Sequence, residues 1–160
     1  MSLASARAHL TKYGLADKII ELPTSSATVE LAAAALKVEA ARITKTMALS
    51  LEDTTILILM AGDVKIDNHK YQQVFHTKAK LVPWDDCEDL VGHPAGGICP
   101  FGIKENIDVY LDDSLRRFYS VYPACGTANT AIELTIPQLE LCAQSKQWID
   151  VTIAKIKENT

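Results

Sequence analysis

The chain has 160 residues, of which 48% are apolar and 22% charged, and this length suits one domain that buries a core without disulfide or metal support. Sixteen basic and 20 acidic residues give a formal net charge of −4, which argues against a surface that coats nucleic acid broadly. Four cysteines (Cys87, Cys99, Cys125 and Cys142) lie far apart with no C-x-x-C spacing, so no zinc or redox motif is signalled.

No apolar run has the length of a transmembrane helix, and the first residues lack the apolar core of a signal peptide. The expectation is a cytoplasmic protein that makes no contact with a membrane and forms a single domain over residues 1–160. Free thiols fit a reducing compartment.

Apolar periodicity and turn residues predict the elements in chain order. Leu3, Ala6, Leu10 and Tyr13 have helical spacing before Gly14. Thr24, Ser25, Ser26 and Thr28 are candidate caps for a second helix. The predicted helices and strands are a helix over 3–13, a strand over 18–22, a helix over 29–36, strands over 43–49 and 54–61, a helix capped by Asp67 that contains Tyr71 and Phe75, a helix over 84–90, strands over 107–111, 119–122 and 130–134, a helix that opens at Pro137, a strand or helix from Trp148, and a polar tail over 155–160.

The run over 54–61 is almost wholly apolar and ends at Gly62-Asp63, which predicts a central strand covered on both faces. Strands and helices mix without regular alternation or repeats. We therefore expect an α/β fold of the α+β type, with a mixed, partly closed, barrel-like sheet and peripheral helices.

Lys45 interrupts an apolar strand face. Ile43, Lys45, Met47 and Leu49 alternate with other residues, so their side chains point to one side of a strand. An ammonium in an apolar layer costs several kcal/mol unless it is paired or opens onto a wet cavity. Lys45 is therefore the first candidate site residue, with a snorkelling structural lysine as the alternative.

A second candidate site is the stretch over 92–102, which holds four glycines and two prolines. Such backbone can approach a ligand closely and turn its N–H groups toward an oxyanion. A tight surface turn explains the composition equally well. The spacing matches neither a P-loop nor a dinucleotide fingerprint.

A third candidate is the small-residue turn over 123–130, which includes Cys125 and Gly126, although a well-capped loop explains it too. Cys99, with His93 six residues before it, is a candidate thiol nucleophile. Buried cysteines are commoner than activated ones, so this reading stays an alternative.

Taken together, several motifs in order resemble the YbaK family, the free-standing relatives of the editing domain of bacterial prolyl-tRNA synthetase. The motifs are Lys45-Thr46 in a strand, Ala61-Gly62-Asp63, Gly96-Gly97-x-Cys99-Pro100-Phe101-Gly102, and Ala124-Cys125-Gly126. The resemblance runs from the second predicted helix to the helix at Pro137.

The resemblance implies a trans-acting aminoacyl-tRNA deacylase that needs no metal or other cofactor. In it, Lys45 meets the phosphate or ribose of the terminal adenosine, and a water helped by the ribose hydroxyl and backbone N–H groups attacks the ester. It implies catalytic roles for Lys45, Gly96, Gly97 and Gly126. The residues implied in substrate binding are Thr46, His93, Cys99, Pro100, Phe101, Gly102 and Cys125.

The implied substrates are tRNAs mischarged with Cys, Ala or Ser, with the proline tRNA among the candidates. The expected partners are the acceptor end of an aminoacyl-tRNA and, secondarily, an aminoacyl-tRNA synthetase. Cys99, Ala124-Cys125-Gly126-Thr127 and His93-Pro94 depart from the common family pattern, which leaves the substrate amino acid open. The alternatives are a non-catalytic module that binds aminoacyl-tRNA or a synthetase, and a thiol hydrolase that uses Cys99.

Overall fold

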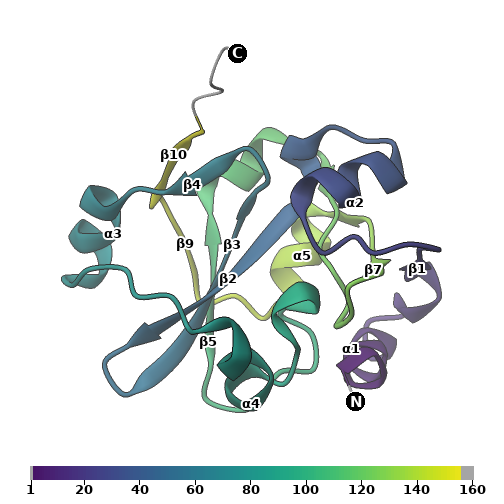
Figure 1. Ribbon diagram of the computed structural model, residues 1–160, viewed down its shortest axis with the longest axis horizontal. Helices are drawn as coiled ribbons and strands as arrows, with labels where there is room; N and C mark the ends of the chain where they lie inside the picture. Colours follow the sequence, from purple (N-terminus) through teal and green to yellow (C-terminus); the bar gives the residue numbers. More distant parts are fainter. Residues whose placement is uncertain (1, 156–160) are drawn as a thin grey trace.

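The structure is a computed structural model that describes residues 2–155. A four-stranded sheet in the order β2-β3-β5-β9 forms its centre (Figure 1). β2 and β3 pair antiparallel, whereas β3–β5 and β5–β9 pair parallel, so the sheet is mixed, as predicted. The strands of this sheet are β2 (Thr44–Leu51), β3 (Thr54–Ala61), β5 (Asp108–Asp112) and β9 (Gln147–Ile149).

Three two-stranded sheets surround it, and none of the four sheets closes on itself within the described part of the chain. They pair β1 with β7, β4 with β10 and β6 with β8. Their strands are β1 (Ile20–Glu21), β4 (Val64–Ile66), β6 (Ser120–Val121), β7 (Thr130–Ala131), β8 (Leu134–Thr135) and β10 (Thr152–Ala154).

Among residues 2–155, five α-helices lie around the sheets, which confirms the mixed α/β architecture. In Figure 1, α3 lies on the opposite side of the sheet strands from α1 and α2. The helices are α1 (Ser2–Thr11), α2 (Val29–Leu36), α3 (Asn68–Phe75), α4 (Cys87–Val91) and α5 (Ile136–Cys142).

Local sequence signals explain several of these boundaries. The Thr28 side chain accepts from the Leu31 N–H and caps α2, and Asp67 accepts from the Lys70 N–H and caps α3. Thr135 and Gln138 form a reciprocal capping box at α5. Each cap satisfies N–H groups that the first helical turn leaves unpaired.

β3 is central, as the sequence predicted. It lies between β2 and β5, and residues 56–61 are all buried. The apolar run therefore forms the middle of the core, which α1 and α5 extend through the buried side chains of Leu10 and Leu139.

Several predicted boundaries were wrong. The strand predicted over 130–134 is two short strands, because Ile132 leaves the pairing and its N–H donates to the Pro123 carbonyl. β4, which follows the predicted turn at Gly62-Asp63, was not predicted. The segment from Trp148 contains two strands, and the predicted polar tail lies, from residue 156 on, outside the described residues.

Asp112 ties the chain end to the central sheet. Its buried carboxylate accepts from the Val151 N–H at 2.9 Å and from the Thr152 hydroxyl at 2.7 Å, and also from the Ser114 N–H. Hydrogen bonds to a buried charge are strong. They fix the start of β10, which pairs with β4 beside Lys45.

Candidate functional site

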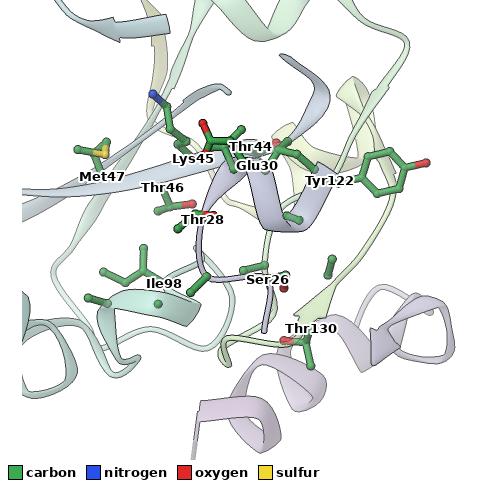
Figure 2. A pocket seen from close by; sticks show the side chains of 18 of the residues that line it. Ser26, Thr28, Glu30, Thr44, Lys45, Thr46, Met47, Ile98, Tyr122 and Thr130 are labelled. Carbon is green, nitrogen blue, oxygen red and sulfur yellow. The ribbon is translucent and has the colours of Figure 1, made fainter. Parts of the chain in front are cut away.

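A cavity of about 310 Å³ opens beside β2 (Figure 2). Its walls come from β2, the start of α2, the short 3₁₀ turn Ala95–Gly97, and the segment between β6 and β7. The polar and charged residues that line it are Ser26, Thr28, Glu30, Thr44, Lys45, Thr46, Tyr122, Thr130 and Lys155. Apolar side chains, Ile98 and Met47 among them, complete the wall.

Lys45 lies between this cavity and a second one of about 300 Å³. The second cavity includes Met47, Met60 and Leu81 in its lining, so the lysine does stand among apolar neighbours. Its Nζ donates to the Val64 carbonyl of β4. The ammonium is therefore held in place while it still faces open space.

The Lys45 ammonium is poorly neutralised. Burial and, second, the nearby Lys155 ammonium lower its pKa from 10.5 to about 8, a shift that Asp63 and Glu30 partly oppose. At neutral pH the group is still mostly a cation. A partly desolvated cation without a full counter-charge is suited to bind an anionic group.

The C-terminal strand brings Lys155 to the site. Ala154 of β10 pairs with Val64 of β4, the residue whose carbonyl holds Lys45. The Lys155 N–H donates to the Asp63 carbonyl at 2.9 Å. A residue 110 positions after Lys45 thus contributes a second cation to the same cavity.

Two threonines on β2 turn hydroxyl groups into buried surroundings. The Oγ1 atoms of Thr44 and Thr46 are buried and have no hydrogen-bond partner among the described residues. Figure 2 shows Lys45 and Thr46 leaving β2 in opposite directions, with Thr46 on the side of Thr28 and Ile98. Buried polar groups without a partner are uncommon in proteins and are a reason to look for a ligand.

Of the glycines predicted to act in catalysis, Gly96 lines the cavity, whereas Gly97 and Gly126 pack against each other beside it. The Gly126 N–H donates to the Gly97 carbonyl at 3.0 Å, and the Gly97 N–H donates to Pro94 at 2.9 Å. A Cβ on Gly97 would lie 2.5 Å from the carbonyl carbon of Gly126. These two N–H groups are already used, and the glycines permit close backbone contact.

His93, Cys99 and Phe101 lie in the core rather than on the cavity wall. The His93 Nε2 is 2.6 Å from the Phe101 carbonyl and 3.5 Å from the Cys99 Sγ. Because that nitrogen donates its hydrogen to the carbonyl, it cannot accept the thiol proton. Burial raises the pKa of Cys99 to about 12, so the structure argues against Cys99 as a nucleophile.

The remaining predicted binding residues also lie away from this cavity. Pro100 and Gly102 line a separate groove of about 570 Å³ beside α1, and Gly102, at φ +66°, packs closely on Ser5. Cys125 is fully buried, and burial raises the pKa of its thiol. The expected contacts of these three residues with the substrate find no support in the geometry.

Sequence reasoning missed several residues of the cavity, including Ser26, Glu30, Tyr122 and Lys155. The hydroxyl cluster before α2 was interpreted only as helix caps, and Lys155 only as part of a polar tail. For Thr28, the capping position was a usable sign of a place in the cavity, because an N-cap residue lies at the exposed N-terminal end of its helix.

Within residues 2–155, no group of three or more His, Cys, Asp or Glu side chains is placed to hold a metal ion. Over the same residues, no helix has the length and apolar character needed to span a bilayer.

Comparison with known proteins shows which family and which relatives the chain is similar to. Residues 24–141 match the family described as aminoacyl-tRNA editing domain. The chain is 47% identical over 152 residues to the uncharacterized protein YwhH of Bacillus subtilis (strain 168), covering 94% of this chain and 97% of that one. It is 25% identical over 130 residues to proline--tRNA ligase of Bacillus cytotoxicus, covering 79% of this chain and 22% of the ligase.

Among solved structures, one described as a candidate trans-editing enzyme for prolyl-tRNA synthetase superposes with a TM-score of 0.86 at 25% identity. The superposition covers 96% of this chain and 98% of that one. The likeness therefore includes both the fold and nearly the whole length. Lys45 and the cavity-lining 3₁₀ turn fall within the family-matched range, whereas Lys155 lies beyond it.

Proposed function

Because the chain belongs to the aminoacyl-tRNA editing domain family, we propose that it is a trans-acting deacylase that hydrolyses the ester bond of mischarged tRNA. The observation that carries the proposal is the Lys45 ammonium, held by the Val64 carbonyl at the wall of a cavity next to a strand edge. The acceptor end of tRNA brings phosphate groups to the ester, and Lys45 supplies the fixed cation that binds them. Lys155 is the second cation for the same end.

The reaction proceeds without a protein nucleophile. Among the described residues, no cysteine lines the cavity, and no histidine or aspartate lines it to activate its serine and threonine hydroxyls. Cys99 lies away from it. A water activated by the ribose hydroxyl of the substrate attacks the ester, as the family resemblance implies. Positioning and electrostatic stabilisation then provide the catalysis.

The cavity favours a small aminoacyl group. Its volume of about 310 Å³ is at the low end of small-molecule sites, and it must also admit the ester and part of the ribose. We propose Ala, Ser and Cys as the amino acids removed, with tRNA for proline as the first carrier to test because of the similarity to part of a proline--tRNA ligase. A synthetase is the proposed protein partner, and the proposed location is the cytoplasm, where tRNA is charged.

The test is hydrolysis of proline tRNA charged with Ala, Ser, Cys or Pro by the wild type, Lys45→Ala and Lys65→Ala. Lys65 is a suitable control because it lines the neighbouring cavity but does not line the proposed site. We expect wild type and Lys65→Ala to release at least one non-cognate amino acid. Lys45→Ala should lose at least tenfold in kcat/KM, which is about 1.4 kcal/mol of transition-state stabilisation.

Two results would contradict the proposal. A folded Lys45→Ala protein with wild-type kcat/KM would remove the role of the cation. Binding of aminoacyl-tRNA by the wild type without release of any amino acid would instead identify a non-catalytic binding module.

A further inference from the structure

β2 is an outer strand of the central sheet. Its edge away from β3 is hydrogen-bonded to other segments on both sides of Thr46. Toward the start of the strand, the Thr44 N–H donates to the Tyr122 carbonyl at 3.1 Å. Toward its end, the Ala48 carbonyl accepts from the Val82 N–H at 2.9 Å, and the Ser50 N–H donates to Lys80 at 2.8 Å. The edge is thus occupied at residues 44, 48 and 50.

Main-chain groups of alternate residues point to the same edge of a strand. Since residues 44, 48 and 50 all bond outward, the N–H and C=O of Thr46 also point outward, away from β3. Because they point away from β3, these groups take no part in the β2–β3 ladder, and no loop or turn of the described residues bonds to either of them. Thr46 lines the 310 Å³ cavity, and its buried hydroxyl is also without a partner there.

The edge therefore has an opening one residue long, which offers one donor and one acceptor to the cavity. We propose that the main chain of Thr46 binds the α-amino acid part of the substrate as a single residue of an antiparallel strand pair. This inference rests on the proposed deacylase function and names the contact that orients its substrate.

The chemistry of an aminoacyl ester matches this opening. Two residues of a hydrogen-bonded antiparallel pair exchange both of their N–H···O bonds. An aminoacyl ester has the same order of atoms as one strand residue, with an α-ammonium, a Cα and a carbonyl. The ammonium donates to the Thr46 carbonyl, and the ester carbonyl accepts from the Thr46 N–H.

The same N–H also serves the reaction. Water adds to the ester carbonyl carbon, the bond from that carbon to the ribose oxygen breaks, and the ribose oxygen takes up a proton that the water gives up. The negative charge that develops on the carbonyl oxygen lies at the Thr46 N–H, where a fixed donor stabilises it. Gly97 and Gly126 cannot supply this donor, because their N–H groups are engaged elsewhere.

Glu30, which lines the same cavity, is the alternative binding partner for the α-ammonium of the substrate. A carboxylate favours a positively charged group, whereas a main-chain carbonyl accepts a hydrogen bond from a charged or a neutral donor. Three acyl groups of similar size separate the two: alanyl, with an ammonium; lactyl, with a neutral hydroxyl donor; and isobutyryl, with a methyl group and no donor.

The experiment measures hydrolysis of these three acyl esters of proline tRNA by the wild type, each relative to its spontaneous hydrolysis, because the ammonium itself activates an ester. We expect alanyl to be cleaved best, lactyl within about tenfold of it, and isobutyryl at least tenfold more slowly than lactyl. Glu30→Gln should keep this order.

On the protein side, replacing Thr46 by its α-hydroxy acid analogue exchanges the N–H for an oxygen and keeps the side chain. It should lower kcat/KM for alanyl-tRNA at least tenfold, while Thr46→Val, which keeps the N–H, should lose less. The analogue removes no bond within the described fold, and thermal unfolding checks that it is folded.

Equal relative rates for alanyl, lactyl and isobutyryl esters would overturn the inference and leave the deacylase intact. Cleavage of alanyl alone, lost in Glu30→Gln, would assign the ammonium to Glu30 and also overturn it. No hydrolysis of any amino acid in the wider panel would instead defeat the deacylase proposal itself.

Discussion

Removal of Lys155 should change the pH at which the proposed deacylase activity is lost. The proposed contact of Lys45 with phosphate requires the protonated ammonium, and the pKa of Lys45 is lowered from 10.5 to about 8. We therefore expect kcat/KM for the preferred mischarged tRNA to fall as pH rises through about 8. A lysine with an ordinary pKa would give no such fall until well above pH 9.

Lys155→Ala removes a like charge beside Lys45, which favours the protonated form of Lys45 and raises its pKa. Burial is the largest cause of the lowered pKa and Lys155 the second, so the pKa should rise without reaching 10.5. For a pair open to solvent, a coupling of roughly 1 kcal/mol corresponds to somewhat less than one pH unit. The falling limb of the profile should move up by about half to one unit.

The assay is the pH dependence of kcat/KM between pH 6 and 9.5, corrected for spontaneous ester hydrolysis. Direct titration of the Lys45 ammonium by NMR supplies the matching value without substrate. Lys65→Ala is the control, since Lys65 is absent from the charges that shift Lys45. An unchanged limb and an unchanged Lys45 pKa in Lys155→Ala would refute the coupling, and a flat wild-type profile would refute the need for a protonated Lys45.

Three further variants test the architecture around the site. Gly97→Ala should lose about 2 kcal/mol or more of unfolding free energy, measured by denaturant titration, because its Cβ would overlap the backbone of Gly126 and Thr127. Gly96→Ala, whose Cβ would meet only Ala27 and Ala128 at 3.4 and 3.6 Å, is the control and should fold nearly as well as wild type. Cys99→Ala should keep kcat/KM within about threefold, since the buried thiol is remote from the cavity wall; loss of all turnover would restore the thiol hydrolase. Asp112→Asn should lower the free energy of unfolding by about 2 kcal/mol, because the amide NH₂ that replaces one carboxylate oxygen would face a hydrogen-bond donor. The control is Asp113→Asn, at an exposed position, which should cause no such loss. Equal stability of the two variants would show that the buried contacts contribute little.

The role of the glycine-rich segment over 92–102 was only partly predictable from the sequence. Its composition indicates close backbone approach, and the structure confirms such approach between Gly97 and Gly126. What the composition leaves open is the partner. Here the approach is made to another loop, and of the four glycines in the segment only Gly96 lines the cavity, together with Ala95 and Ile98.

The sequence by itself determined the elements whose signals are local. Apolar alternation marked β2 and β3, capping residues marked α2 and α3, and Lys45 was recognisable as a cation in an apolar strand. These features depend on a residue and its near neighbours in the chain, so periodicity and side-chain chemistry suffice to predict them.

Tertiary structure alone decided the rest of the site. Burial of His93 and Cys99, arrival of Lys155 beside Lys45, and the opening at Thr46 all depend on segments far apart in the sequence. Whether the main chain of Thr46 is paired or free follows from which strand lies at the edge and which loops bond it. A strand pattern specifies its two faces but not its neighbours, and for that reason the proposed substrate contact became visible only in the folded chain.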